Sequence, residues 1–302
     1  MSSAKLDTID FSSKHSVMIE DSDGTLQPMD EPYFKPEKIA PGTWMCLTDG
    51  DFSYLVEGDQ EALVIDSGYG CGNIRSFCQT LTEKPVCNIV NTHYHFDHTA
   101  NNCYFDCVYL SAETKKKATI PMPSFGNIHF PRDYQTQVID EGYVFHLGNR
   151  DLETISIPCH AEGALGFLDR KERLLFCGDE MYRNVHLHRS VRCFADNLKK
   201  MLSYRDGFDR FCCGEGVYGL SLMEDALRCA EYILDGHAQE GICLTPTPLC
   251  VLPTGDEKIV YKRRIPRPHD AQSKPDPNFA FQRVLRYGNY AITYDIRKVK
   301  GD

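Results

Sequence analysis

The chain has 302 residues, of which 42% are hydrophobic and 11% aromatic, which is enough for one large domain with an appendage or for two modest domains. Its formal net charge of -10 argues against nucleic-acid binding, because no overall positive field attracts phosphates. No apolar run approaches the roughly 18 residues of a membrane helix, and the N-terminus lacks the apolar stretch of a signal peptide. We therefore expect a cytoplasmic protein with a small-molecule substrate and with no nucleic-acid or membrane partner, whereas homo-oligomer formation stays open.

The cysteines do not predict disulfides. The chain contains 14 of them, scattered and without a CxxC pair. Several lie in apolar, strand-like runs: Cys46, Cys87, Cys177, Cys212 and Cys213. In a reducing compartment such residues are mostly small buried hydrophobic side chains, so we expect free thiols rather than a disulfide framework.

The first half of the chain predicts a strand meander followed by a helix and a strand. Residues 1–38 are polar, contain Pro28, Pro32 and Pro36, and are predicted to form an N-terminal arm. Short apolar runs separated by turn residues then predict strands within residues 43–68. A helix is expected at about residues 73–81, and the β-branched run VCNIVNT predicts a strand that ends at a histidine cluster.

The second half repeats this arrangement of strands that end in polar residues. We expect strands at 153–159 and 210–213, a hairpin over 164–180, and helices at 194–204 and 221–238. Prolines then alternate with short strands such as NYAITYD. The predicted domains are therefore the arm at 1–38, a main domain at 39–245 and a β-rich C-terminal extension at 246–302.

The histidine cluster is the clearest functional feature. His93, His95, Asp97 and His98 directly follow a predicted strand, where a rigid sheet can hold ligands open to solvent. Neutral imidazoles and carboxylates suit Zn²⁺, Fe²⁺ or Mn²⁺, and a carboxylate can bridge two such ions. Three more candidate ligands follow other predicted strands: His160, Asp179 and Glu215. The pattern predicts a metal site.

These motifs give the chain a resemblance to the metallo-β-lactamase superfamily over roughly residues 40–245. The similar segments are THYHFDH, IPCHAEG and LLFCGDE. The resemblance implies an α/β (α+β) fold, a four-layer αββα sandwich with the metal ions at one edge. It also places Asp66, at the end of EALVIDSG, close beneath the site as a supporting residue.

The resemblance implies a ligand set for two divalent ions, with Zn²⁺ foremost and Fe²⁺ or Mn²⁺ as alternatives. One ion would be bound by His93, His95 and His160. The second would be bound by Asp97 and His98, with Asp179 bridging both ions. The loop after His160 reads Ala-Glu-Gly instead of the usual Thr/Ser-Pro-Gly, so it departs from the family pattern.

Glu215 marks a second departure. The family normally completes its ligand set with a histidine in a Gly-His-Gly-like turn, whereas this chain reads CCGEGVYG. We predict that Glu215 is an oxygen ligand of the second ion. Such a harder donor would shift that position toward Mn or Fe. The alternatives are that Glu215 only supports other ligands or faces solvent, or that a nearby histidine takes this role.

This ligand set predicts a metal-dependent hydrolase. Two ions can share a bridging hydroxide that attacks a carbonyl, with Asp97 as the catalytic residue that orients the nucleophile. The predicted substrates are ester, thioester or lactone-like small molecules. No Gly-x-Ser-x-Gly elbow, Walker motif or dinucleotide fingerprint suggests a competing mechanism.

Two other functions stay open. A mononuclear iron oxidoreductase, similar to the persulfide dioxygenases of the superfamily, would use only His93, His160 and Asp179. A noncatalytic metal-binding protein could retain the same fold. Substrate selectivity would come from the loops after Asp179 and at 122–131, where Tyr182, Arg183, His186 and His188 can contact a polar substrate or supply a ligand.

Overall fold

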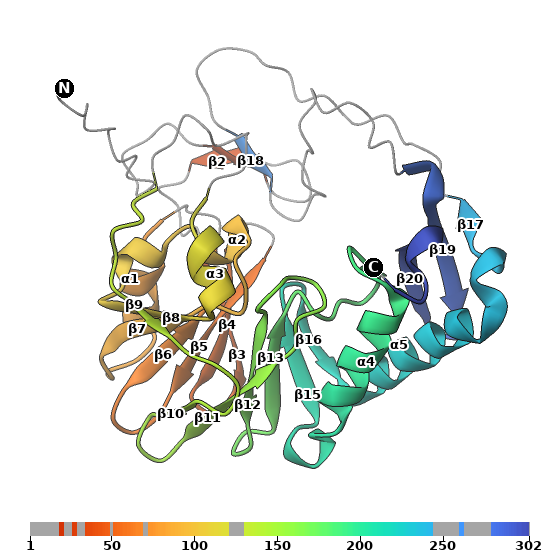
Figure 1. Cartoon of the computed structure of the whole chain (residues 1–302). Helices are drawn as coiled ribbons and strands as arrows, with labels where there is room; N and C mark the ends of the chain where they lie inside the picture. The colour runs from red at the N-terminus through yellow and green to blue at the C-terminus, as the bar shows by residue number, and fades with distance from the viewer. Residues whose placement is uncertain are drawn as a thin grey trace. The chain divides into compact units, whose positions relative to one another are not determined.

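The computed structural model describes residues 18–20, 26–28, 34–48, 51–68, 72–120, 130–243, 260–262 and 279–301. The chain divides into two compact units (Figure 1). Unit 1 comprises residues 1–140, 145–151 and 253–267, and unit 2 comprises residues 141–144, 152–252 and 268–302. The predicted boundaries at residues 38 and 245 stay predictions.

Unit 1 contains a seven-stranded sheet whose strands follow chain order. They are β3 (Lys35–Ala40), β4 (Thr43–Leu47), β5 (Phe52–Glu57), β6 (Ala62–Ile65), β7 (Val86–Val90), β8 (Cys107–Leu110) and β9 (Thr136–Val138). β3 to β6 pair antiparallel, and β6 to β9 pair parallel. β4 to β6 confirm the meander predicted within residues 43–68, whereas β3 was not predicted. The carboxyl ends of β6 and β7 therefore lie at the same edge of the sheet.

Three helices accompany this sheet: α1 (Ile74–Gln79), α2 (Phe96–Thr99) and α3 (Ala112–Lys117). α1 confirms the helix predicted near residues 73–81, and it begins where the Asn73 side chain accepts a hydrogen bond from the Ser76 amide at 3.0 Å. Ile74 and Cys78 of α1 pack with Val64 and Ile89 of the sheet in one buried cluster. This packing fixes β6 and β7, the two strands that precede the histidine cluster.

Unit 2 contains a six-stranded sheet in the order β10-β11-β12-β13-β15-β16. The strands are β10 (Val144–His146), β11 (Asp151–Ser156), β12 (Leu165–Asp169), β13 (Leu174–Gly178), β15 (Arg210–Cys213) and β16 (Gly216–Gly219). β12 and β13 form the predicted hairpin, and both are buried along their whole length. β13 pairs parallel with β15, so their carboxyl ends also meet at one edge.

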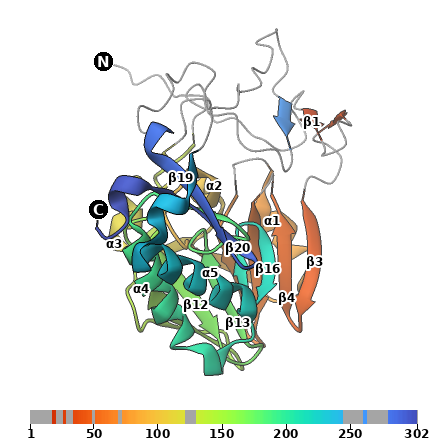
Figure 2. The same ribbon diagram turned by 90° about the vertical axis from the view of Figure 1, so that its right-hand side faces the viewer.

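Helices α4 (Val191–Leu202) and α5 (Leu220–Tyr232) lie side by side in Figures 1 and 2. α4 begins three residues before the predicted start, because Ser190 caps the helix by accepting the Cys193 amide at 3.2 Å. The regular α5 ends earlier than predicted. It continues into a π-type turn at Ile233–His237, where Gly236 has a φ of 110° that interrupts the helical backbone.

The described part of the C-terminal extension is β-rich, as predicted. β19 (Gln282–Tyr287) and β20 (Tyr290–Asp295) form a hairpin, and β14 (Val185–His186) and β17 (Ile242–Cys243) complete a four-stranded sheet. Leu285, Tyr290 and Ile292 belong to the same buried cluster as residues of α4 and α5. β19 and β20 lie next to α5 in Figure 2. These residues are therefore part of the core of unit 2. A further three-stranded sheet joins β1 (Met18–Glu20), β2 (Leu26–Pro28) and β18 (Val260–Lys262).

Two sequence predictions concern the chain as a whole. The cysteines that the structure describes are free, and Cys46, Cys177, Cys212 and Cys213 are buried as predicted, whereas Cys87 is only half-buried. Over the described residues, no helix combines the length and the apolar character required to cross a bilayer.

Candidate metal centre

The histidine cluster of unit 1 connects β7 to α2. Residues 91–95 leave the end of β7, and α2 then places Asp97 and His98 in a single helical turn. His93, Asp97 and His98 are each about 1% exposed, and His95 is half-buried. Buried imidazoles and carboxylates at a strand end match the predicted position of the site.

Asp66, directly after β6, orients His98. Its Oδ1 accepts the Thr92 amide at 2.7 Å, and its Oδ2 accepts the Thr92 hydroxyl at 2.7 Å. The same Oδ2 lies 2.9 Å from Nδ1 of His98. A carboxylate requires a proton on that nitrogen, so the network assigns the proton of His98 to Nδ1. Nε2 of His98 is then directed at Asp97, whose Oδ2 is 3.3 Å away.

Thr92 orients His93 in the same way. The Thr92 hydroxyl donates to Asp66, so its oxygen accepts a proton from Nδ1 of His93 at 3.0 Å. His93 therefore carries its proton on Nδ1 as well, and presents Nε2 as a lone pair. One carboxylate, Asp66, thereby sets the tautomer of two histidines. This arrangement is the usual support of metal-binding imidazoles.

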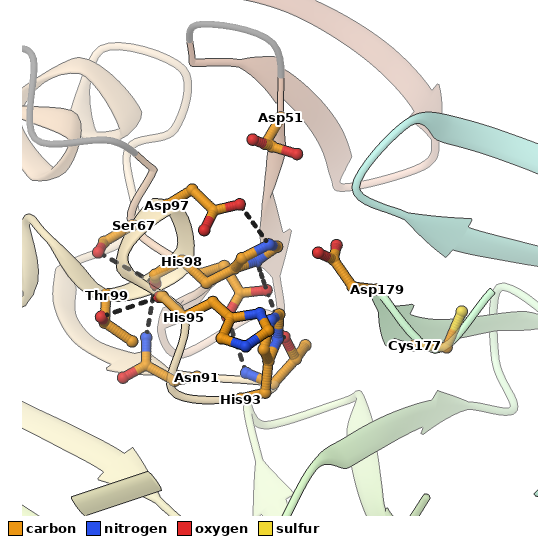
Figure 3. Close-up of polar contacts among 12 residues, drawn as sticks. Asp51, Ser67, Asn91, His93, His95, Asp97, His98, Thr99, Cys177 and Asp179 are labelled. Atoms are coloured by element: carbon orange, nitrogen blue, oxygen red, sulfur yellow. Dashed lines mark hydrogen bonds and ion pairs between the residues drawn. The ribbon is translucent and has the colours of Figure 1, made fainter. Parts of the chain in front are cut away.

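The backbone of the cluster is fixed by both neighbouring strands. The carbonyl of His98 accepts the amide and the hydroxyl of Ser67, at 2.9 and 3.2 Å, and Nδ2 of Asn91 at 3.0 Å (Figure 3). The Thr99 hydroxyl donates to the carbonyl of His95 at 3.0 Å. The sequence analysis missed Ser67 and Asn91. The one feature of the sequence that could have indicated them is that each is a polar residue just after a predicted strand.

Asp51 is a further carboxylate beside the cluster that the sequence analysis did not identify. It lies just before β5 and is 8% exposed. One ligand atom each from Asp51, Asp97 and His98 lie within 4.8 Å of one another (Figure 3). A mixed set of two carboxylates and one imidazole is a donor set that Zn²⁺, Mn²⁺ and Fe²⁺ accept.

Unit 2 brings together two of its predicted ligands. His160 follows β11, Asp179 follows β13, and His160 Nε2 lies 3.6 Å from Asp179 Oδ2. Gly178, immediately before Asp179, has a φ of 51°, a left-handed conformation that favours glycine. Asp179 is 3% exposed and His160 is half-buried.

Glu180 holds the loop that carries His160. Its carboxylate accepts the amides of Cys159 and His160, at 3.0 and 2.8 Å, and Nδ2 of Asn197 at 2.7 Å. Burial raises the pKa of Glu180, and the hydrogen bonds from the backbone oppose that shift. The sequence analysis missed this role, although a second acid directly after Asp179 at the end of a buried strand was a visible signal.

Glu215 lies between β15 and β16 and is exposed. Its Oε2 accepts the Arg183 amide at 3.0 Å. Although the residue as a whole is exposed, partial desolvation of its carboxylate raises the pKa of Glu215, with the charge of Asp179 as a further cause. A ligand role for Glu215 stays a prediction.

The predicted selectivity residues are only partly described. The ring centroids of His188 and His160 are 5.4 Å apart, and those of His186 and His188 are 5.7 Å apart in a stacked arrangement. These histidines line a small pocket together with Asp179 and Glu180. Most of the loop expected at 122–131 lies outside the described residues, which resume at 130.

Comparison with known proteins identifies the family. A family model described as the metallo-beta-lactamase superfamily matches residues 49–211, more than half of the chain. The chain belongs to the metallo-β-lactamase superfamily. The matched residues include the histidine cluster, His160 and Asp179, and they cover residues of both units.

Two relatives with a named activity are a thioesterase and a hydrolase. The acyl-coenzyme A thioesterase MBLAC2 of Gallus gallus is 28% identical over 158 residues, 43% of this chain and 57% of that protein. The mitochondrial hydroxyacylglutathione hydrolase of Saccharomyces cerevisiae is 26% identical over 164 residues, 52% of this chain and 54% of that protein. The chain thus spans little more than half the length of these relatives.

Solved metallo-β-lactamase structures share the fold. A metallo-beta-lactamase from Pontibacter korlensis matches with a TM-score of 0.53 at 16% identity, over 66% of this chain and 99% of that protein. This likeness confirms the predicted mixed α/β fold of the superfamily.

Superfamily membership implies divalent metal ions, and the residues present fit them. His93 and His98 have the Nδ1-protonated tautomer that leaves Nε2 to bind a metal. Asp97 and Asp179 add buried carboxylates, each 3% exposed or less. Imidazole nitrogen and carboxylate oxygen are the ligands that such ions take from proteins.

Proposed function

We propose that this protein is a metal-dependent hydrolase of thioesters. The sequence predicts hydrolysis of esters, thioesters or lactone-like small molecules. Among these substrates, the acyl-coenzyme A thioesterase and the hydroxyacylglutathione hydrolase favour thioesters, because coenzyme A and glutathione are both thiols that carry acyl groups on sulfur. The acidic chain, with its net charge of -10, supports a small-molecule substrate rather than nucleic acid. We extend the proposal to a cytoplasmic location without a membrane partner.

The observation that carries the proposal is the shared support of His93 and His98. Asp66 and Thr92 fix the proton on Nδ1 of both rings, which prepares both Nε2 atoms as metal ligands before any ion binds. The proposed ligands are the residues predicted from the sequence: His93, His95, Asp97, His98, His160, Asp179 and Glu215.

The bound ions would supply a water of lowered pKa at neutral pH and would polarise the acyl carbonyl. Asp97 would then have two tasks. It would bind an ion together with His98, whose Nε2 lies 3.3 Å from one carboxylate oxygen. Its second carboxylate oxygen can accept the proton of the attacking water. A thiolate leaving group suits this residue set, because a thiol has a pKa of about 8.5 and leaves without a general acid.

His186 and His188 are the proposed selectivity residues. They line the pocket that contains His160 and Asp179, on the same strand-end side of unit 2. Their imidazoles can donate hydrogen bonds to carbonyl or carboxylate groups of an acyl chain or its thiol carrier. We propose that they position the substrate rather than bind metal.

Metal content and thioester hydrolysis test this proposal together. The untagged full-length protein is purified and its ions are counted by elemental mass spectrometry. Thiol release is then followed for an acyl-coenzyme A, an acylglutathione, an oxygen ester and a lactone. The proposal expects about two divalent ions per chain and fastest turnover of a thioester, with His93→Ala nearly inactive. A Glu215→Ala variant that retains fewer ions would support Glu215 as a ligand.

Other outcomes separate the two remaining functions. A single iron ion, unchanged in Glu215→Ala and accompanied by oxygen consumption with a persulfide, would establish the mononuclear iron oxidoreductase instead. A protein that binds ions but hydrolyses none of the four substrates would favour a noncatalytic metal-binding role. No bound ion after metal-replete purification would contradict both enzymatic functions.

A further inference from the structure

Asp51 lies beside the histidine cluster but has no role in the ligand set proposed above. The residue is 8% exposed, and its carboxylate belongs to the same group of ligand atoms as Asp97 and His98, all within 4.8 Å of one another. Figure 3 shows the Asp51 carboxylate on the side of the cluster where Asp97 and His98 face each other.

The backbone holds Asp51 firmly in that position. Its carbonyl accepts both the amide and the hydroxyl of Thr48, each at 2.9 Å. The Thr48 side chain in turn packs against Gly68, where a Cβ atom would lie only 2.6 Å from the Thr48 hydroxyl. Gly68 follows the loop of Asp66 and Ser67 that holds His98. Asp51 and His98 are therefore fixed to one common frame.

The buried carboxylates around His98 favour a bound cation. His98 already lies between two carboxylates, with Nδ1 2.9 Å from Asp66 and Nε2 3.3 Å from Asp97. Asp51 adds a third buried carboxylate. Like charges at this spacing repel and their desolvation is unfavourable, so the arrangement is costly unless a positive charge offsets it. A neutral His98 does not supply that charge.

The geometry fits a metal ion. Donor atoms bound to one Zn²⁺ at about 2.0–2.2 Å lie at most about 4.4 Å apart, so a group within 4.8 Å needs only small side-chain adjustments to surround an ion. Two carboxylates and one imidazole form a harder donor set than three imidazoles, and such a set also suits Mn²⁺ and Fe²⁺.

We propose that Asp51 is a ligand of the ion held by Asp97 and His98. This inference rests on the proposed function, since it concerns the second metal position. It offers a reason why the chain tolerates glutamate in place of the histidine that normally completes this position: a carboxylate from the turn before β5 supplies the additional donor. The ligand comes from the same unit as Asp97 and His98.

The test compares three variants of the full-length, untagged protein. Asp51→Asn removes the charge but keeps the backbone carbonyl that closes the turn with Thr48. His98→Ala identifies the ion that belongs to this position. Glu37→Gln, at an exposed acid on β3 of the same sheet, is the matched control. Metal-free protein is titrated with Co²⁺, and binding is followed by visible absorption, chelator competition and elemental mass spectrometry.

The inference expects two ions in the unsubstituted protein. Asp51→Asn should weaken the binding of the same ion that His98→Ala removes, by about tenfold or more. Even substitution of a residue that only hydrogen-bonds to a metal ligand lowers metal affinity by about 10–100-fold. The other ion and the Glu37→Gln variant should be unchanged. Thermal unfolding of the metal-free proteins checks folding. Asp51→Asn should be no less stable than the unsubstituted chain, since it relieves repulsion.

Two results would overturn the inference while the proposed hydrolase stands. The first is that Asp51→Asn retains both ions at full affinity although His98→Ala loses one. The second is two ions that neither substitution affects, which would show that His98 and Asp51 bind no metal. A chain that takes up no Co²⁺ at all would instead refute the proposed function, and the inference with it.

Discussion

Asp66 Oδ2 lies 2.9 Å from Nδ1 of His98, and through Thr92 the same carboxylate also orients His93. Asp66 has a φ of 62°, a left-handed conformation that a non-glycine residue adopts only at some cost. Three hydrogen bonds to one carboxylate stabilise that conformation. Asp66 thus connects the end of β6 to two candidate ligands without binding a metal itself.

Replacing Asp66 with asparagine should therefore weaken metal binding. The amide can accept at one atom only, and its NH₂ group would face a donor, so His98 would be driven toward the wrong tautomer. We expect a loss of about 10–100-fold in metal affinity, measured by chelator competition. Glu37→Gln is the control. Unchanged affinity in Asp66→Asn would contradict the orienting role.

Glu180 should stabilise unit 2 even without metal. A Glu180→Gln substitution places an NH₂ group against backbone amides or against Nδ2 of Asn197, and leaves a buried donor without an acceptor. The free energy of unfolding should fall by about 1–3 kcal/mol. Urea unfolding of the metal-free protein measures this change. Glu172→Gln, at a half-buried acid in the turn between β12 and β13, is the comparison, and an equal effect of both substitutions would contradict the loop-holding role.

The ion pair of Arg75 with Asp106 should make a small, pH-dependent contribution to stability. The Arg75 guanidinium lowers the pKa of Asp106, and its other hydrogen bonds reach the carbonyls of Val86 and Tyr104. Because the folded pKa is depressed, the contribution is present above the unfolded pKa of Asp106. It disappears as the pH falls through the lower, folded value.

Asp106→Asn should accordingly cost at most about 1 kcal/mol at pH 7, since the pair is largely exposed to solvent. The difference between variant and parent should vanish in acid, where Asp106 is protonated in both states. Urea unfolding curves at pH 7 and at a series of lower pH values provide the comparison. A difference that stays constant as the pH falls would mean that shape rather than charge is responsible.

Removing divalent ions should lower stability. An ion that binds only the folded chain adds about 2.7 kcal/mol at a free concentration of 100 times its dissociation constant. Denaturant unfolding with Zn²⁺ and with excess chelator measures this difference. His98→Ala should show a smaller one, because it lacks a ligand that Asp66 orients. Superimposable curves in the unsubstituted protein would show that no ion binds the folded state.

The short-range pattern of residues was enough to predict much of the fold. Short apolar runs between turn signals located β4, β5 and β6, because such runs are typical of buried strands. The close spacing of His93, His95, Asp97 and His98 along the chain also predicted the candidate metal site. All four residues belong to one loop and helical turn, so chain geometry alone keeps them near each other.

Only the tertiary structure decided which distant residues support that loop. Asp51, Asp66 and Ser67 approach His98 because β5, β6 and β7 lie in register in one sheet, and no local repeat encodes that register. Glu180 likewise acquires its role from the packing of β13 beside the loop of His160. The sequence determined which donor atoms are available and which of them are neighbours along the chain. Packing determined which of the others come within a few ångströms, because long-range contacts depend on the shape of the whole core.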